Sequence, residues 1–147
     1  MDTEGDFTIT LNATTLAIGV GRCSDSEANS DNRKSGMIGV KITTGTAPTA
    51  GCYTIYLLRD AGTVKSDGWA GSDAAFVPVN AKILGTIQVT NDADTAFSEV
   101  FDTRNVVEHL GVNFGIAIIN DTNQAANNAP ANHEATFRLH TPEFQDT

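Results

Sequence analysis

The sequence predicts an all-β protein: an antiparallel β-sandwich of jelly-roll or Greek-key type, with about eight strands and one short helix. The first observation is alternation of apolar and other residues in short segments, the period of a strand with one buried face. The second is the Gly, Asn, Asp, Thr and Pro between these segments, which supply turns. No internal repeat suggests a propeller or solenoid. The alternating segments are Ile38–Ile42, Tyr53–Leu57, Ile83–Val89, Phe97–Phe101, Phe114–Ile118 and Phe137–Leu139.

The N-terminal half is expected to alternate between strands and polar loops. The run Ser24–Ser35 contains no apolar residue larger than Ala. We therefore expect an exposed loop there, or an arm that becomes ordered only against a partner. Gly45–Gly51 contains Pro48 and is expected to turn. The strands expected in this half are Phe7–Leu11, an extended Thr15–Gly21, Gly36–Thr44 and Cys52–Arg59.

The C-terminal half begins with a long Gly/Asp/Ser loop, Asp60–Ala75, which carries the only tryptophan, Trp69. Phe76–Val79 is expected to be a short edge strand, because its proline cannot donate a hydrogen bond to a ladder. The strands expected after it are Lys82–Thr90, Ala96–Phe101, Asn113–Asn120 and His133–His140.

One short helix is expected within Asp102–Leu110, where apolar residues recur at helical spacing. Asp102 or Thr103 would be its N-cap, and Gly111 would end it after one or two turns.

The length of 147 residues predicts one domain, residues 1–147, with a polar N-terminal arm (1–6) and a polar C-terminal tail (141–147). A domain of this size buries enough surface to fold without disulfides or metals. We expect Cys23 and Cys52 to be reduced thiols, Cys52 being buried, although a bridge between them remains open. The predicted core consists of Ile38, Val40, Ile42, Ile55, Leu57, Ile83, Ile87, Phe97, Phe101, Ile116, Ile118, Phe137 and Leu139.

The net charge of −9 indicates which partners to exclude. An acidic domain repels the phosphate backbone, so no nucleic-acid partner is expected. No segment approaches the roughly 18 consecutive apolar residues of a membrane span. The acidic start, Met1–Asp6, lacks the basic and apolar regions of a signal peptide, so we expect synthesis in the cytoplasm.

No group of residues in the sequence has the pattern of a reactive centre, so we expect neither an enzyme nor a bound cofactor or metal. The three histidines, His109, His133 and His140, lack the spacing of a zinc site. The motifs of serine hydrolases, phosphate-binding loops and dinucleotide folds are absent. Asp92 and Asp94 occupy a turn and lack the order of an EF-hand loop.

Two hypotheses remain for the tryptophan loop. Trp69 either packs at the core edge or contacts another subunit, or it forms a sugar-binding platform with Asp67 and Asp73. The mixed charges of the Ser24–Ser35 loop are expected to pair across an interface. The candidate subunit-contact residues are Asp25, Glu27, Asp31, Arg33, Lys34 and Trp69.

Several segments between Gly36 and Leu139 together resemble small structural proteins of tailed bacteriophages, similar to capsid decoration, or cement, proteins. One departure lies at Val112-Asn113-Phe114, where the family pattern has a Pro-basic-Trp sequence; another is the Asn-rich loop Asp121–Ala131. The segments that carry the resemblance are Gly71–Ala75, Ile83–Ile87, Phe97–Phe101, Leu110–Asn120 and Asn132–Ala135.

The resemblance implies a β-sandwich with no catalytic residues, located on the capsid surface of a virion. It implies the major capsid protein as the partner and a homo-oligomer, a trimer, at capsid symmetry points. Contacts between capsomers would then be stabilised by many copies of modest affinity. The alternatives are a neck, tail or fibre component, or a lectin-like carbohydrate-binding module.

Overall fold

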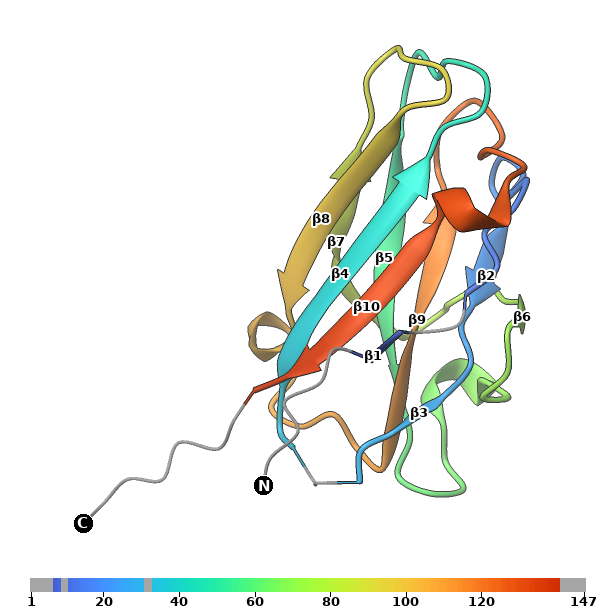
Figure 1. Ribbon diagram of the computed structural model, residues 1–147. Helices are drawn as coiled ribbons and strands as arrows, with labels where there is room; N and C mark the ends of the chain where they lie inside the picture. Colours follow the sequence, from blue (N-terminus) through green and yellow to red (C-terminus); the bar gives the residue numbers. More distant parts are fainter. Residues whose placement is uncertain (1–6, 9–10, 31–32, 141–147) are drawn as a thin grey trace.

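The computed structural model describes residues 7–8, 11–30 and 33–140, and these form two antiparallel β-sheets packed face to face (Figure 1). Sheet A has the strand order β1-β10-β4-β8, and sheet B has the order β6-β2-β9-β5-β7, with β3 also paired to β9. The predicted all-β sandwich is therefore confirmed. Sheet A consists of β1 (Phe7–Thr8), β4 (Gly36–Thr43), β8 (Ala96–Asp102) and β10 (Glu134–Leu139). Sheet B consists of β2 (Gly21–Cys23), β3 (Glu27–Ala28), β5 (Cys52–Arg59), β6 (Ala74–Ala75), β7 (Lys82–Gln88) and β9 (Asn113–Asn120).

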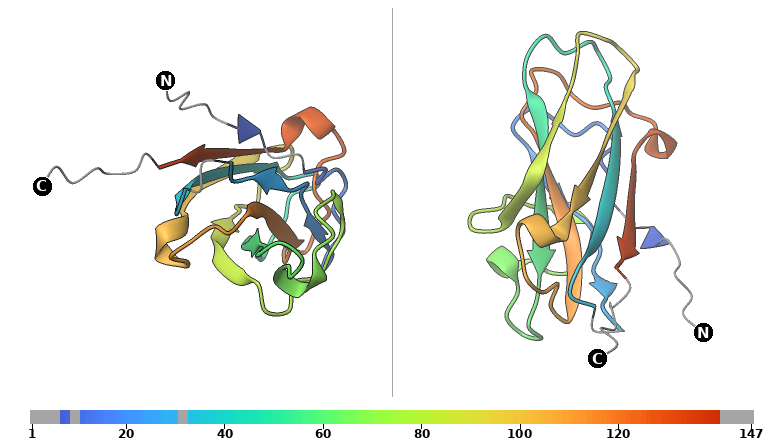
Figure 2. Two further views of the ribbon diagram at one scale, coloured as in Figure 1. Left: turned by 90° about the horizontal axis from the view of Figure 1, so that it is seen from below. Right: turned by 90° about the vertical axis from the view of Figure 1, so that its left-hand side faces the viewer.

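The chain crosses repeatedly between the two sheets. It passes from β4 to β5, from β7 to β8, from β8 to β9 and from β9 to β10, and each of these connections changes sheet. Neighbours within a sheet are therefore distant in sequence, as in the Greek-key connections of β-sandwiches. The two layers are separate when the molecule is viewed along the strands (Figure 2).

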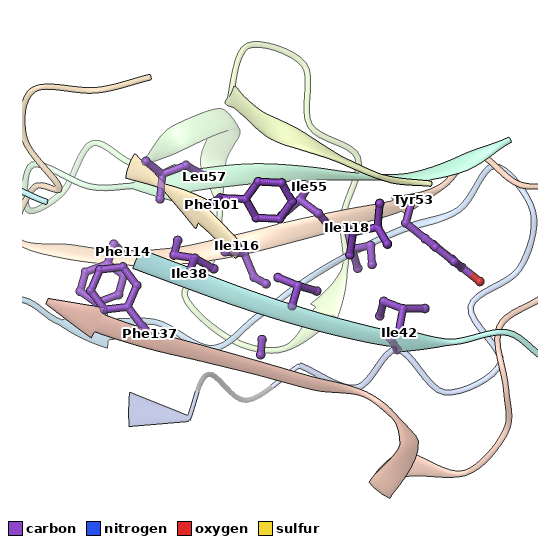
Figure 3. Packing of buried hydrophobic residues seen from close by; sticks show 14 of the residues in the cluster. Ile38, Ile42, Tyr53, Ile55, Leu57, Phe101, Phe114, Ile116, Ile118 and Phe137 are labelled. Carbon is purple, nitrogen blue, oxygen red and sulfur yellow. The ribbon is translucent and has the colours of Figure 1, made fainter. Parts of the chain in front are cut away.

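The main core lies between the sheets and is built from inward-facing alternate residues of β4, β5 and β9 (Figure 3). Phe114 of sheet B and Phe137 of sheet A join the layers, with ring centroids 4.1 Å apart. Most of the predicted core residues are buried, but Phe97 and Leu139 are only partly buried at its margin.

Ile83 was expected in the core and is 53% exposed, so this part of the prediction is wrong. The cause is a β-bulge at Leu84: Gly85 pairs with Ile55, but Ile83 pairs with Tyr56. Cross-strand partners share a face of the sheet. Ile83 therefore points outward beside Tyr56. Gly85 takes the inward position, where the Phe101 ring leaves no room for a Cβ.

A second, smaller core covers the outer face of sheet B. The segment between β5 and β7 folds back over this face, and Trp69 is buried there against Cys23, Leu58 and Ala117. The indole Nε1 donates to the backbone oxygen of Ser24 at 3.0 Å. The long loop that was expected between these strands is therefore a packed layer.

Two expected strands do not form where the sequence predicts them. Thr15–Gly21 is not a strand: Thr15 turns the chain with φ of 52°, and β2 begins only at Gly21. Phe76–Val79 forms no strand, and the edge strand is β6, immediately before it.

The expected helix is a single 3₁₀ turn, η2 (Thr103–Asn105), whose N-cap is Asp102 as predicted. Gly111 has positive φ, but it faces the backbone of Asp60 and ends no helix. Two further 3₁₀ turns are η1 (Ser66–Gly68) and η3 (Pro130–Asn132).

Strand β8 forms one edge of sheet A. Glu99 lies on the core-facing side of this strand, between Phe97 and Phe101, and pairs with the buried Val40 of β4. The edge position nevertheless leaves Glu99 exposed, and its carboxylate accepts a hydrogen bond from the Val100 amide at 2.9 Å. One of the alternate residues on the core-facing side of β8 is therefore an acid, Glu99.

Candidate interaction surfaces

The outer face of sheet A is the first candidate surface. β4, β8 and β10 present this face toward the viewer in Figure 1, and within the described residues no segment crosses it. Met37 and Val100, which lie on it, are 39% and 56% exposed. Two apolar side chains on one flat face that no described segment covers make this face a candidate contact surface.

The centre of this face is hollow at Gly39, which pairs with Val100 on one side and Thr136 on the other. The missing side chain leaves a shallow depression of about 180 Å³. An ion pair borders it, with Lys41 Nζ 3.1 Å from the Glu134 carboxylate. We call the surface formed by Met37, Gly39, Lys41, Val100, Glu134 and Thr136 the sheet-A face.

The outer face of sheet B is different because the second core covers it. Trp69 was a candidate contact residue and a candidate sugar platform, but only 1% of it is exposed. Asp67 and Asp73, the acids expected beside it, are engaged elsewhere. Asp67 accepts hydrogen bonds from the amides of residues 79–81, and Asp73 pairs with Arg22 at 2.5 Å. The packing interpretation of Trp69 is therefore correct, and the lectin-like site proposed around it is wrong.

The N-terminal part of the Ser24–Ser35 loop packs on the domain itself. Ser24 and Asn29 are buried, and their amides donate to backbone oxygens of β9 and of the residue before it. Asp25 accepts a hydrogen bond from the Asp73 amide at 2.6 Å. Burial, together with the nearby charge of Asp25, raises the pKa of Glu27. The expectation of a wholly exposed loop is thus wrong for these residues.

Two further candidates from this loop, Arg33 and Lys34, lie just before the start of β4. The Asn29 side chain accepts from the Arg33 amide at 2.8 Å and donates to the Gly111 oxygen at 2.9 Å. This holds Arg33 near the start of β9. Lys34 is exposed. Asp31 lies outside the described residues, as do the predicted arm 1–6 and tail 141–147.

Two carboxylates brace the loops around sheet B. Burial alone would raise the pKa of Asp67, but hydrogen bonds from three backbone amides hold that pKa below its ordinary value. Asp60 behaves in the same way, since burial is outweighed by hydrogen bonds from Asn113 and Gly62. Both groups therefore stabilise the fold in their ionised form.

The cysteines and histidines are not gathered into one centre. Cys23 and Cys52 are free, and burial raises the pKa of the Cys23 thiol; Cys52, expected to be buried, is only half-buried. His133 and His140 flank β10 rather than lying on it. No group of three or more His, Cys, Asp or Glu side chains in the described part of the chain is placed to hold a metal ion. None of the described helices is long and apolar enough to span a membrane.

The second candidate surface is a depression of about 530 Å³ at the end of the sandwich where β4 ends and β8 begins, the top of Figure 1. Three loops line it, contributing Gly45–Thr46, Ala93–Asp94 and Gln124–Asn128. We call it the tip depression. No feature of the sequence alone indicated it, because the three loops are distant in the chain.

Comparison of the chain with models of protein families, with curated proteins and with solved structures finds no match.

Proposed function

We propose that the protein is a non-enzymatic decoration, or cement, protein of a bacteriophage capsid, and that it docks through the sheet-A face. The observation that carries the proposal is the asymmetry of the sandwich. The second core covers the outer side of sheet B and leaves Ile83 exposed only on the edge strand β7, whereas no described segment covers the outer side of sheet A, where Met37 and Val100 are exposed.

The chemistry of the sheet-A face suits a flat protein contact. Val100 supplies apolar area beside the hollow at Gly39, and Thr136 and the Lys41–Glu134 ion pair supply polar groups around it. A mixture of apolar area and polar groups is usual for an interface between proteins that form separately and then associate. The partner in this proposal is the major capsid protein, with further copies of this chain as neighbours in a trimer.

Modest affinity at each site is sufficient for this role. A capsid presents many equivalent sites, so a copy that contacts two or three neighbours gains strength through effective concentration. The resemblance to decoration proteins supports the same assignment.

The test is binding of the purified protein to capsid shells that lack it, measured by co-sedimentation. Val100→Asp places a charge on the sheet-A face and is expected to reduce binding at least tenfold, because burial of an unpaired carboxylate is unfavourable. Val64→Asp is the matched control, because Val64 is 74% exposed on a loop away from this face. Both variants should melt cooperatively. Equal binding by the two variants would contradict docking through the sheet-A face.

Imaging of purified virions tests the location. Hundreds of copies over the shell are expected for a decoration protein. Six or twelve copies at one vertex would instead indicate the neck, tail or fibre component that is the alternative, and would overturn the capsid assignment.

A further inference from the structure

The tip depression has a rigid frame. The Asp94 amide donates to the Gly45 oxygen at 3.0 Å, and the Asn127 amide donates to the Thr43 oxygen at 3.0 Å. The Asn127 side chain in turn donates to the Asp94 carboxylate at 2.8 Å. His133 contacts the Asn127 oxygen through its ring nitrogen at 2.9 Å. The three loops are thus bonded to one another and to the strands, so the depression is formed before any ligand arrives.

Several polar side chains around this frame remain available. Among the described residues, no hydrogen bond engages the side chains of Thr46, Gln124 or Asn128, although all three line the depression. Asp94 adds a carboxylate whose second oxygen accepts no hydrogen bond within the described structure. The site therefore offers amide donors, amide and carboxylate acceptors and one hydroxyl group.

The charges around the depression exclude several kinds of ligand. Residues 44–51, 89–95 and 120–133, which form this end of the sandwich, contain no Lys or Arg. An anionic ligand would therefore meet no opposite charge, and would face Asp94. A divalent cation needs several oxygen ligands, usually more than one carboxylate, and Asp94 is the only carboxylate in the lining.

We propose that the tip depression binds a neutral carbohydrate. Sugar hydroxyls both donate and accept hydrogen bonds, which matches the amides of Gln124 and Asn128 and the carboxylate of Asp94. The methyl groups of Ala93 and Ala125 give the C–H face of a sugar ring an apolar surface to pack on. No aromatic residue lines the site, so a single sugar should bind weakly, with Kd on the order of 1 mM.

The tip depression is separate from the sheet-A face, through which the protein docks in the proposed function. The sheet-A face lies along the middle of β4, β8 and β10, whereas the tip depression lies in the loops at their end. A protein docked through the sheet-A face would keep the tip loops free. The two proposals can therefore fail independently of each other.

Saturation-transfer NMR on the purified protein tests the inference without capsids. The probes are the methyl glycosides of glucose, galactose, mannose, N-acetylglucosamine and N-acetylgalactosamine, each at several millimolar. At least one is expected to receive saturation from the protein. Ala93→Trp fills the depression and should abolish the transfer. Asn128→Ala should weaken binding at least threefold, because it removes one amide.

Two control variants separate the site from general surface effects. Ala70→Trp adds the same indole at an exposed alanine over the second core, and Gln88→Ala removes an exposed amide on β7. Both should bind the sugar like the wild type. The inference is wrong if no glycoside receives saturation, or if Ala93→Trp binds as well as Ala70→Trp. It is equally wrong if calcium chloride alone perturbs the Asp94 resonances and no sugar does.

Discussion

The contact between Gly115 and Trp69 offers a direct test of the second core. A Cβ at Gly115 would lie 2.7 Å from Trp69 Cζ2 and 2.9 Å from Cη2, with Ser24 Oγ also at 2.7 Å. Carbon atoms pack at about 3.5–4.0 Å, so Gly115→Ala requires the indole to move. The indole cannot move freely, because Trp69 is buried and its Nε1 is hydrogen-bonded to Ser24.

We expect Gly115→Ala to cost about 1–3 kcal/mol of stability, the usual range for overpacking. In a domain of this size the melting temperature should fall by roughly 3–10 °C. Thermal melts monitored by the fluorescence of the single tryptophan report on the same contact. The indole emission should also shift to longer wavelength if the displaced ring meets water.

A double-mutant cycle shows whether Trp69 is the cause. Trp69→Phe removes the six-membered part of the indole that faces Gly115, so Gly115→Ala should cost less in this background by about 1 kcal/mol. Melts of these variants are followed by far-ultraviolet circular dichroism. The close approach to Ser24 persists, so the relief should be partial. An unchanged melting temperature for Gly115→Ala, or strictly additive effects in the cycle, would refute this account of the second core.

Three further predictions concern other parts of the fold. Ile118→Asp should give no cooperative melt, because Ile118 is fully buried opposite Ile55 and an unpaired buried charge costs several kcal/mol; a soluble variant that melts cooperatively would contradict the strand assignment. Asp67→Asn should lower the melting temperature at pH 7. Its difference from the wild type should shrink below about pH 4, because a carboxyl whose pKa is depressed on folding stabilises only while it is ionised. Hydrogen exchange of the free protein should show slowly exchanging amides at Ser24 and Asn29, which donate to backbone oxygens at 2.9 Å. Rapid exchange at both would instead support the hypothesis that this loop becomes ordered only against a partner.

The strands of the main core were predictable because their signal is local. Alternation alone places residues such as Ile38, Ile42 and Ile116 on inward faces, and the structure buries all three. The same reasoning fails at Ile83. Leu84 is an extra residue in β7, so the residues of β7 before it point to the opposite face from the one that alternation predicts. Gly85 is a local sign of an irregularity, because an isolated glycine in a strand often marks a bulge, but the position of the bulge depends on pairing with β5.

The surfaces were harder to predict than the strands. The packed position of Trp69 depends on small residues, Gly115 and Ala117, at outward positions of β9. That pattern is visible in the sequence, yet it becomes meaningful only once the segment before β7 is known to fold back over the sheet. The tip depression and the hollow at Gly39 are assembled from segments far apart in the chain, so no local pattern could predict them.

Glu99 has a consequence for the behaviour of the protein at high concentration. An open strand such as β8 can template the addition of a strand from another molecule. A strand that added to β8 would extend the core-facing side of sheet A and would enclose the Glu99 carboxylate against apolar side chains. Removing that charge from water without a partner is strongly unfavourable. The buried charge would therefore oppose polymerisation along this edge, even at high protein concentration.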